Sequence, residues 1–411
     1  MKRRDFLKLA GAVSVAGCAT PTPSKARVVV IGGGYGGATA AKYIRMWDPS
    51  IDVVLVERDA GFISCPISNL VLAGYSSMDE ISRGYDGLRR HGVQVVQDEV
   101  TAIDAAKKSV RLARGADIAY ERLIVSPGID FTFGEVQGYE SVMQAGGVLH
   151  AWKAGAQTVA LRRQLEDMRD GGVYILSVPL QPYRCPPGPY ERASMVAAYF
   201  KQAKPRSKVL VLDANPNVTS KGGLFKRAWS DLYPGILEFR GNAKVVGVER
   251  GAVRTDFDTI RGDVLNVVPP HRAGDIAMKA GLITTNNRWC DIDWRTMESK
   301  TVKGVHVLGD ATLSAPGMPK SGSMANNHAK IAAAAVVELL NGRAPQPVKI
   351  INTCYSFVSQ KEAIRVSSVH EWDGTTLQPV KGAGGVSAAR SEAEGTYAWN
   401  WARTIWADSL A

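Results

Sequence analysis

The feature that most limits the possible folds is a glycine-rich turn after an early apolar run. Residues 27–31 read Arg-Val-Val-Val-Ile, and such a β-branched run is typical of a strand buried on both faces. The turn carries Gly32, Gly34 and Gly37 in the pattern G-x-G-x-x-G, and a helical stretch over 38–47 follows. The first glycine permits a tight turn, the second lets a pyrophosphate approach the backbone, and the third lets helix meet strand. The segment predicts a dinucleotide-binding strand–turn–helix.

The second strand of this unit strengthens the prediction. Residues 52–56 read Asp-Val-Val-Leu-Val and are followed by Glu57. An acid at this point of a βαβ unit accepts hydrogen bonds from the ribose of the nucleotide. A glycine motif alone is weak evidence, but strand, helix, second strand and terminal acid in register predict a Rossmann-like unit.

A distant segment indicates which dinucleotide is bound. Residues 304–311 form a short strand that ends at Asp310, and in flavoproteins with two dinucleotide-binding domains an aspartate here binds the ribityl chain of FAD. A long alanine-rich helix is predicted over 323–340, and its positive N-terminal end would stabilise a reduced, anionic flavin. Lys320, just before it, is predicted to lie among the cofactor-binding residues, although a helix-start residue is its more ordinary role. FAD is favoured over NAD, in a domain formed by two separate segments.

The intervening segment resembles a second nucleotide-binding unit without its phosphate-binding turn. A helix is predicted over 157–169 and strands over 172–177 and 208–213. Where a glycine fingerprint should follow the first of these strands, residues 178–189 are rich in proline and contain Cys185. Proline lacks the backbone N–H that cradles a pyrophosphate, and its ring obstructs close approach. This unit is therefore predicted to bind no nucleotide.

These segments predict an α/β fold with two Rossmann-like dinucleotide-binding domains, glutathione-reductase-like, plus a smaller C-terminal α+β domain. The expected boundaries are 1–24 for a signal peptide, 25–140 for the first part of the FAD-binding domain, 141–264 for the NADH-binding-like domain, 265–345 for the second part of the FAD-binding domain, and 346–411 for a C-terminal interface domain.

The N-terminal residues carry a twin-arginine export motif. Arg3 and Arg4 precede a short, weakly apolar run over 9–17, which is too short to span a bilayer. The run ends at Cys18 in a lipobox-like context, so Cys18 either becomes a lipid-modified N-terminus or is part of a cleaved peptide. The expected location is the periplasm, with possible peripheral membrane attachment through lipid.

Three other cysteines, Cys65, Cys185 and Cys354, have separate sequence contexts. A cysteine in an exported protein is usually oxidised or committed to a cofactor, so two of the three can pair and one can tether a flavin. The net charge is +11, but the basic residues are dispersed, and nucleic acid is not expected as a partner. The histidines show no metal-ligand spacing, so no metal site is predicted.

Several motifs together resemble the flavoprotein subunit of flavocytochrome c sulfide dehydrogenase, a relative of the sulfide:quinone oxidoreductases. The motifs span nearly the whole chain and include GGGYGGATAAKYI, RCPPGPYERAS, VVPPHRAG, GVHVLGDA, MPKSGSMANN and NTCYS. The resemblance implies a thioether from Cys65 to the flavin 8-methyl group and a redox-active disulfide between Cys185 and Cys354. It also implies a haem-bearing c-type cytochrome partner. This sequence contains no C-x-x-C-H motif, so the chain is expected to attach no haem of its own.

Each of these residues also has an ordinary structural interpretation. The Cys185–Cys354 pair could staple the C-terminal segment, and Cys65 could be a free buried thiol. Cys290 is expected to be a small core residue, and Glu191 is either a proton handler near the sulfur or a capping residue.

The C-terminal helix predicted over 396–406 has an aromatic stripe. Tyr397, Trp401 and the Ile405/Trp406 pair fall at helical spacing. Packing of this stripe into the core is favoured over insertion into a membrane surface.

Three functions remain open from the sequence. The first is a sulfide dehydrogenase that passes electrons to a c-type cytochrome, and the second performs the same half-reaction with a membrane quinone. The third, from a different class, is an electron-transfer or sulfur-binding accessory protein with little activity of its own. The acceptor, the sulfur product and the cysteine that sulfide attacks first cannot be deduced from the sequence.

Overall fold

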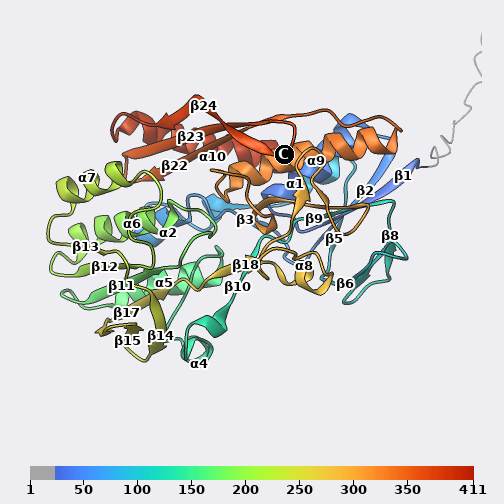
Figure 1. Ribbon diagram of the computed structural model, residues 1–411. Helices are drawn as coiled ribbons and strands as arrows, with labels where there is room; N and C mark the ends of the chain where they lie inside the picture. Colours follow the sequence, from blue (N-terminus) through green and yellow to red (C-terminus); the bar gives the residue numbers. More distant parts are fainter. Residues whose placement is uncertain (1–23) are drawn as a thin grey trace, which may run out of the picture.

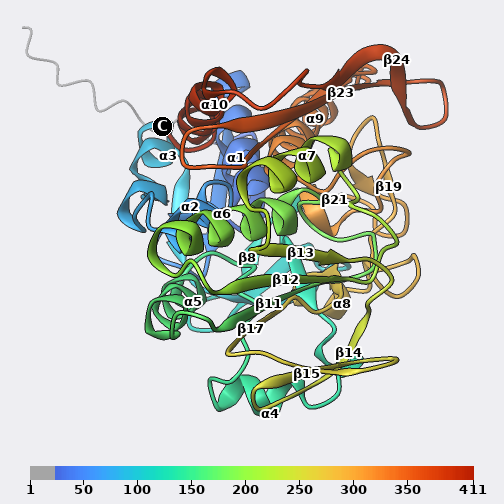
Figure 2. The same cartoon turned by 90° about the vertical axis from the view of Figure 1, so that its left-hand side faces the viewer.

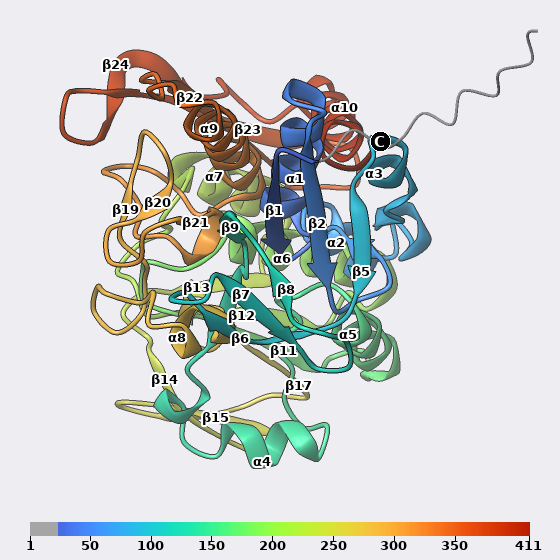
Figure 3. The ribbon, with the colours of Figure 1, turned by 90° about the vertical axis from the view of Figure 1, so that its right-hand side faces the viewer.

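A computed structural model describes residues 24–411. The twin-arginine motif and Cys18 lie outside these residues. A seven-stranded sheet, with parallel pairing from β21 through β5, forms the first unit (Figure 3). In sheet order its strands are β19 (Ile292–Asp293), β20 (Glu298–Ser299), β21 (Val305–Val307), β9 (Arg122–Val125), β1 (Ala26–Ile31), β2 (Ile51–Glu57) and β5 (Gln94–Gln97).

This sheet joins two distant segments of the chain. Strand β21 pairs in parallel with β9, so Val305 lies opposite Leu123. Helix α1 (Tyr35–Trp47) follows the glycine-rich turn and packs against α9 (Gly322–Leu340). The helix begins at Tyr35 rather than at the predicted residue 38, because two glycines of the turn already belong to its first turn.

Smaller elements surround the first unit. They are β3 (Phe62–Ile63), β4 (Ser82–Arg83), α2 (Ser68–Ala73), α3 (Asp86–Arg90), the antiparallel β6 (Val100–Asp104), β7 (Ser109–Leu112) and β8 (Ile118–Ala119), the antiparallel pair β10 (Ile129–Phe131) and β18 (His271–Ala273), and α8 (Asp275–Lys279).

The second unit has a four-stranded parallel sheet (Figure 2). In sheet order its strands are β13 (Leu237–Arg240), β12 (Lys208–Asp213), β11 (Val173–Val178) and β17 (Val264–Val267), with helices α5 (Ala156–Asp167), α6 (Gly188–Ala203) and α7 (Gly222–Leu232). The antiparallel strands β14 (Val245–Glu249), β15 (Ala252–Thr255) and β16 (Thr259–Arg261) and helix α4 (Tyr139–Gln144) lie at its end. The boundary predicted at 264 falls at the start of β17.

The C-terminal unit consists of an antiparallel sheet and a long helix. Its strands are β22 (Lys349–Phe357), β23 (Ala363–Trp372) and β24 (Leu377–Val386), and its helix is α10 (Glu392–Leu410). Figure 1 shows this unit, in red, along the top of the molecule. Strand β22 contacts α6 of the second unit and α9 of the first, so it bridges the two. The predicted fold class is confirmed.

The aromatic stripe of α10 faces the protein for most of its length. Ile405 and Trp406 are buried and belong to the same hydrophobic core as the first sheet, whereas Tyr397 is 54% exposed. Trp406 donates a hydrogen bond from Nε1 to the Tyr35 hydroxyl at 3.0 Å. Within residues 24–411, no helix combines the length and apolar character needed to cross a membrane.

Candidate functional site

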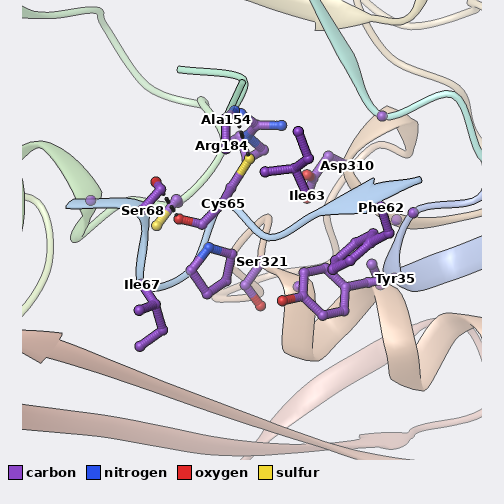
Figure 4. A pocket seen from close by; sticks show the side chains of 18 of the residues that line it. Tyr35, Phe62, Ile63, Cys65, Ile67, Ser68, Ala154, Arg184, Asp310 and Ser321 are labelled. Carbon is purple, nitrogen blue, oxygen red and sulfur yellow. Dashed lines mark hydrogen bonds between the residues drawn. The ribbon is translucent and has the colours of Figure 1, made fainter. Parts of the chain in front are cut away.

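One cavity of about 890 Å³ collects residues from all three units. Its walls are the glycine-rich turn, the segment before α2, the loop that enters α6, the N-terminus of α9, strand β22 and helix α10 (Figure 4). The parallel strands of the first sheet bring the turn after β1, the end of β2 and the segment after β21 to one edge, where ligands of such sheets bind.

The glycine-rich turn has the shape that a phosphate-binding turn requires. Gly32 has φ +93°, and a Cβ there would lie 2.4 Å from the Ser126 carbonyl oxygen. A Cβ on Gly37 would lie 1.8 Å from the Gly32 oxygen, so only glycine lets the helix approach the strand this closely. A Cβ on Gly34 would meet nothing within 4 Å. The turn is therefore tight on its protein side and open on its cavity side.

Glu57 stands at the end of β2 on the cavity wall. Its Oε2 accepts a hydrogen bond from the Gly33 amide at 2.6 Å, and its Oε1 accepts one from the Asp59 amide at 2.9 Å. Each carboxylate oxygen can accept a further bond, so Glu57 can still bind a ribose hydroxyl.

Asp310 is a buried carboxylate that lacks a partner. It follows β21 and lines the cavity, and its Oδ1 is buried with no hydrogen-bond partner among the described residues. Burial raises the pKa of Asp310, while the nearby Arg184 and Lys320 oppose this rise. An unpaired buried acceptor of this kind costs free energy unless a donor reaches it. The ribityl hydroxyls of FAD would supply such donors, and the residues present fit the predicted cofactor.

The N-terminus of α9 completes this wall. Ser321 caps the helix: its Oγ accepts a bond from the Met324 amide at 3.1 Å and donates one to Asn352 Oδ1 at 2.8 Å. Gly322 and Ser323 line the cavity with the positive end of the helix.

Lys320 lies next to this helix with its side chain buried. Its Nζ donates to the Thr312 carbonyl and lies 3.7 Å from the ring centroid of Trp289. Burial lowers the pKa of Lys320 to about 7, and Asp310 opposes the effect. The Lys320 carbonyl accepts a bond from the Cys185 amide at 2.8 Å, so this residue also anchors the cysteine loop.

Cys65 lies in the segment between β3 and α2, and its side chain extends toward Ala154 and Arg184 (Figure 4). Its Sγ accepts a bond from the Ala154 amide at 3.4 Å and donates to the Trp152 carbonyl at 3.8 Å. Cys65 therefore lines the cavity on the wall formed by the segment between β3 and α2. The sequence predicts covalent flavin attachment at this cysteine.

Cys185 and Cys354 reach the cavity from the second and C-terminal units. Cys185 has φ +59° and directly precedes the prolines that start α6, whereas Cys354 lies within β22. Both line the cavity, and both are free thiols in this structure. The Cys354 thiol donates to Asn352 Oδ1 at 3.4 Å. The fold therefore brings the two cysteines to one site, although it does not join them.

The charges around these thiols differ. Burial raises the pKa of both. The neighbouring Cys354 and Glu191 raise the pKa of Cys185 further, whereas the main opposing influence on Cys354 is the ammonium of Lys221. Lys221 was not singled out in the sequence, since a lone lysine in Ser-Lys-Gly-Gly between a strand and a helix carries no motif.

Glu191, on the first turn of α6, is buried beside the thiols. Its Oε1 accepts a bond from the Phe357 amide and its Oε2 one from Asn69 Nδ2, both at 2.7 Å. Burial raises the pKa of Glu191. The carboxylate therefore ties α6 to β22 and to the segment behind Cys65. Cys290, in contrast, is fully buried in the core of the first unit and does not line the cavity.

The end of β12 shows what replaced a second nucleotide site. Asp213 occupies the position in the second unit that Glu57 occupies in the first. It is fully buried and accepts hydrogen bonds from the Tyr190 hydroxyl at 2.7 Å and from the amide and side chain of Asn215 at 2.8 Å. The acid is used internally and is closed to a ribose.

Comparisons with known proteins agree with this arrangement. Three family models match parts of the chain: a pyridine nucleotide-disulphide oxidoreductase model over 26–166, the central part of the sulfide dehydrogenase (flavocytochrome c) flavoprotein chain over 158–269, and the flavin-binding part of flavocytochrome c sulphide dehydrogenase over 346–410.

Individual relatives fall in the same group. The chain is 62% identical over 45 residues to the sulfide dehydrogenase (flavocytochrome c) flavoprotein chain of Chlorobaculum thiosulfatiphilum, which is 11% of this chain and 94% of that sequence. It is 25% identical over 309 residues to the mitochondrial sulfide:quinone oxidoreductase of Mus musculus, which is 69% of this chain and 65% of that protein. It thus spans slightly less than two thirds of that relative's length.

Among solved structures, the sulfide:quinone oxidoreductase of Aquifex aeolicus superposes with a TM-score of 0.77 at 18% identity, covering 93% of this chain and 91% of that one. At this identity the likeness supports the fold alone.

Proposed function

Because the chain belongs to the family of flavoprotein chains of flavocytochrome c sulfide dehydrogenase, we propose that it is an FAD-dependent enzyme that oxidises hydrosulfide. The observation that carries this proposal is the meeting of Cys185 and Cys354 in the cavity that also holds the dinucleotide cradle. Two thiols from distant segments beside a flavin site suit a two-electron oxidation of sulfur.

The chain's own residues would hold the cofactor along the whole cavity. The open turn at Gly34 would receive the pyrophosphate, Glu57 the adenosine ribose, and Asp310 the ribityl chain. Bound FAD takes up two electrons from sulfur and releases them singly, as a haem acceptor requires. Cys185 and Cys354 would react with the sulfur substrate, and the cavity walls would exclude water from the reacting sulfurs.

The proposed step is a thiol–disulfide exchange. Hydrosulfide attacks one sulfur of the oxidised Cys185–Cys354 pair, a new S–S bond forms as the bond between the cysteines breaks, and the other cysteine leaves as a thiolate with the electron pair. The hydrosulfide proton stays on the outer sulfur of the resulting persulfide. The net half-reaction converts HS⁻ to zero-valent sulfur, one proton and two electrons, which FAD would take up when bound.

Serine substitutions test this proposal. Cys185→Ser and Cys354→Ser should each abolish flavin bleaching by sulfide in a stopped-flow measurement, because exchange needs one sulfur to attack and another to leave. Dithionite should still reduce the flavin in both variants, which controls for cofactor loading. If the pair only stapled the C-terminal unit, the double variant would lose a few kcal/mol of stability, about 2–4, and keep its turnover. Such a result would overturn the mechanism.

We also propose that Cys65 holds FAD covalently by a thioether. Support comes from its position on the cavity wall, where Ala154 fixes its sulfur. Acid precipitation should leave yellow colour on the protein, and Cys65→Ala should release it to the supernatant. Complete loss of flavin from the wild-type protein would contradict the thioether.

The proposed electron acceptor is a haem-bearing c-type cytochrome, as the family name suggests. The similarity in sequence to a mitochondrial sulfide:quinone oxidoreductase favours a quinone as the alternative. Sulfide-dependent reduction of cytochrome c and of a short-chain quinone, measured side by side with the same enzyme, separates the two.

The proposed location is the periplasm, reached by twin-arginine export. Lipid on Cys18 would add peripheral membrane attachment. Mass spectrometry of the mature N-terminus tests both: a lipid-modified Cys18 is expected, and a mature chain that begins after Cys18 would exclude the anchor.

A further inference from the structure

Lys221 connects the second unit to the strand that carries Cys354. It lies at the N-terminus of α7 with φ +54°, and only 7% of its surface is exposed. Its Nζ donates hydrogen bonds to the Cys354 carbonyl at 3.2 Å and to Ser356 Oγ at 2.9 Å. A buried lysine is costly unless its charge is used or compensated. Both partners lie on β22: one is the carbonyl of Cys354 itself, and the other is the hydroxyl of Ser356 further along the same strand.

Two thiols and two carboxylates surround the Lys221 ammonium. Glu191 is one of these carboxylates, and its two oxygens accept hydrogen bonds from the Phe357 amide and Asn69. Glu394 of α10 is a further acid in its surroundings, and burial lowers the pKa of Lys221 to about 8, an effect that Cys354 opposes most strongly. The ammonium form therefore predominates at neutral pH.

The ammonium acts unequally on the two cysteines. At Cys354 it is the largest influence that lowers the thiol pKa against burial. At Cys185 it comes after Arg184, and Cys354 and Glu191 both act in the opposite sense. Arg192 is also close to Cys185. Its buried guanidinium donates hydrogen bonds to the side chains of Asn69 and Asn266 and to the carbonyls of His150 and Ala151. The two sulfurs thus differ in how readily each holds a negative charge.

We propose that Lys221 is a positioning residue that makes Cys354 the thiolate-forming member of the pair, so that hydrosulfide attacks Cys185. This inference rests on the proposed disulfide exchange. The S–S bond between the two cysteines breaks, the electron pair stays on Cys354, and Cys185 carries the persulfide with the hydrosulfide proton on its outer sulfur. A thiol with a lower pKa is the better leaving group in such an exchange.

The first test compares the two cysteines within the unmodified holoenzyme. After chemical reduction, iodoacetamide is applied across a pH series, and alkylation of each cysteine is followed by peptide mass spectrometry. Only the thiolate reacts, so each profile reports one thiol pKa. The midpoint for Cys354 should lie below that for Cys185. The reverse order, or coincident midpoints, would overturn the assignment.

The second test changes the charge. Lys221→Met should move the Cys354 midpoint upward by about one pH unit or more, which is a tenfold or larger loss of alkylation rate at neutral pH, and should move Cys185 less. Lys221→Arg should keep the wild-type profile, because arginine retains the positive charge. If Lys221 acted only through its shape and packing, arginine would not restore the profile. Lys226→Met is the matched control: Lys226 lies on the same helix, and its Nζ contacts Asn217 Oδ1 at 3.4 Å.

The outcomes separate this inference from the proposed function. An unchanged Cys354 midpoint in Lys221→Met, or equal shifts of both cysteines, would exclude the role of Lys221. Should Lys221→Met not fold, the order of midpoints in the unmodified enzyme still decides. Failure of sulfide to bleach the wild-type flavin would instead defeat the proposed function, and that measurement is independent of the alkylation profiles.

Discussion

The two Rossmann-like units share one strand order but treat their nucleotide sites in opposite ways. In the first, β9, β1, β2 and β5 lie side by side in parallel; in the second, β17, β11, β12 and β13 do the same. The topological position for a ligand therefore exists twice. Only the local chemistry at the strand ends differs.

The turns after β1 and β11 account for the first difference. In the first unit, Gly34 leaves room at the start of α1 for a pyrophosphate. In the second, prolines occupy the turn, and Pro187 and Pro189 stand at the start of α6. A proline offers no N–H to a phosphate, so the start of α6 lacks a backbone donor at each of these two positions.

The acids at the strand ends account for the second difference. Glu57 lines the cavity, whereas Asp213 is fully buried and bound by Tyr190 and Asn215. The same topology thus binds a nucleotide or not according to whether these few groups stay free. The loop released from phosphate binding instead delivers Cys185 to the first unit's cavity, where the Lys320 carbonyl fixes its amide.

The largest expected effect of this comparison concerns reductants. Sulfide should bleach the flavin rapidly, while NADH should leave it oxidised, because the second unit offers neither a phosphate-binding turn nor a free ribose acid. Anaerobic stopped-flow absorbance with each reductant measures both. Rapid, saturable bleaching by NADH would show that the second site still binds a nucleotide.

The two strand-end acids provide a smaller and more local test. In a Cys65→Ala background, in which the proposed thioether cannot form, Glu57→Gln should weaken FAD binding by about tenfold or more. A hydrogen bond to a charged group contributes about 1.5–3 kcal/mol. Asp213→Asn, the matched change in the second unit, should leave FAD affinity unchanged. Fluorescence titration of each apoprotein gives the dissociation constants. Equal losses at both positions would mean that the two acids are not functionally different.

The sequence predicted what depends on local pattern. The β-branched runs gave β1, β2 and β12 to within about one residue, and the alanine-rich run gave α9, because a strand buried on both faces and a long packed helix leave strong periodic signals. The glycines, Glu57 and Asp310 lie at one sheet edge because parallel strands impose it.

What the sequence did not reveal depends on contacts between distant segments. Lys221 follows β12 yet contacts β22, and nothing in its own neighbourhood marks that pairing. The hydrogen bond from Tyr190 to Asp213 likewise joins the end of β12 to the preceding helix α6. The sequence therefore showed that the glycine fingerprint is missing, but not that Tyr190 binds the strand-end acid. Tyr397 fits the apolar stripe of α10 by spacing but is exposed, because the buried face of the helix runs through Ala398 and Ala402 instead.

The smallest expected effect concerns the hydrogen bond from Tyr190 to Asp213. Tyr190→Phe removes the hydroxyl that binds Asp213 and should lower the free energy of unfolding by about 1–3 kcal/mol. Burial raises the pKa of Asp213 and the Tyr190 hydrogen bond opposes this rise, so the variant's folded-state pKa should be higher still. When a carboxyl group has a higher pKa in the folded than in the unfolded protein, the protein loses stability as the pH rises above the group's ordinary pKa, which is 3.8 for an aspartate. The deficit of the variant should therefore be small in acid and grow toward neutral pH.

Urea unfolding in acidic and neutral buffers measures this deficit. Tyr174→Phe is the matched control, because Tyr174 is equally buried in the second unit and donates at 2.8 Å to Asn266, a neutral amide oxygen. Its loss of stability should not vary with pH in this window, since no carboxylate is involved. A pH-independent deficit in Tyr190→Phe would show that Asp213 does not depend on this hydroxyl, and the difference between the two units would then rest on the proline-rich turn alone.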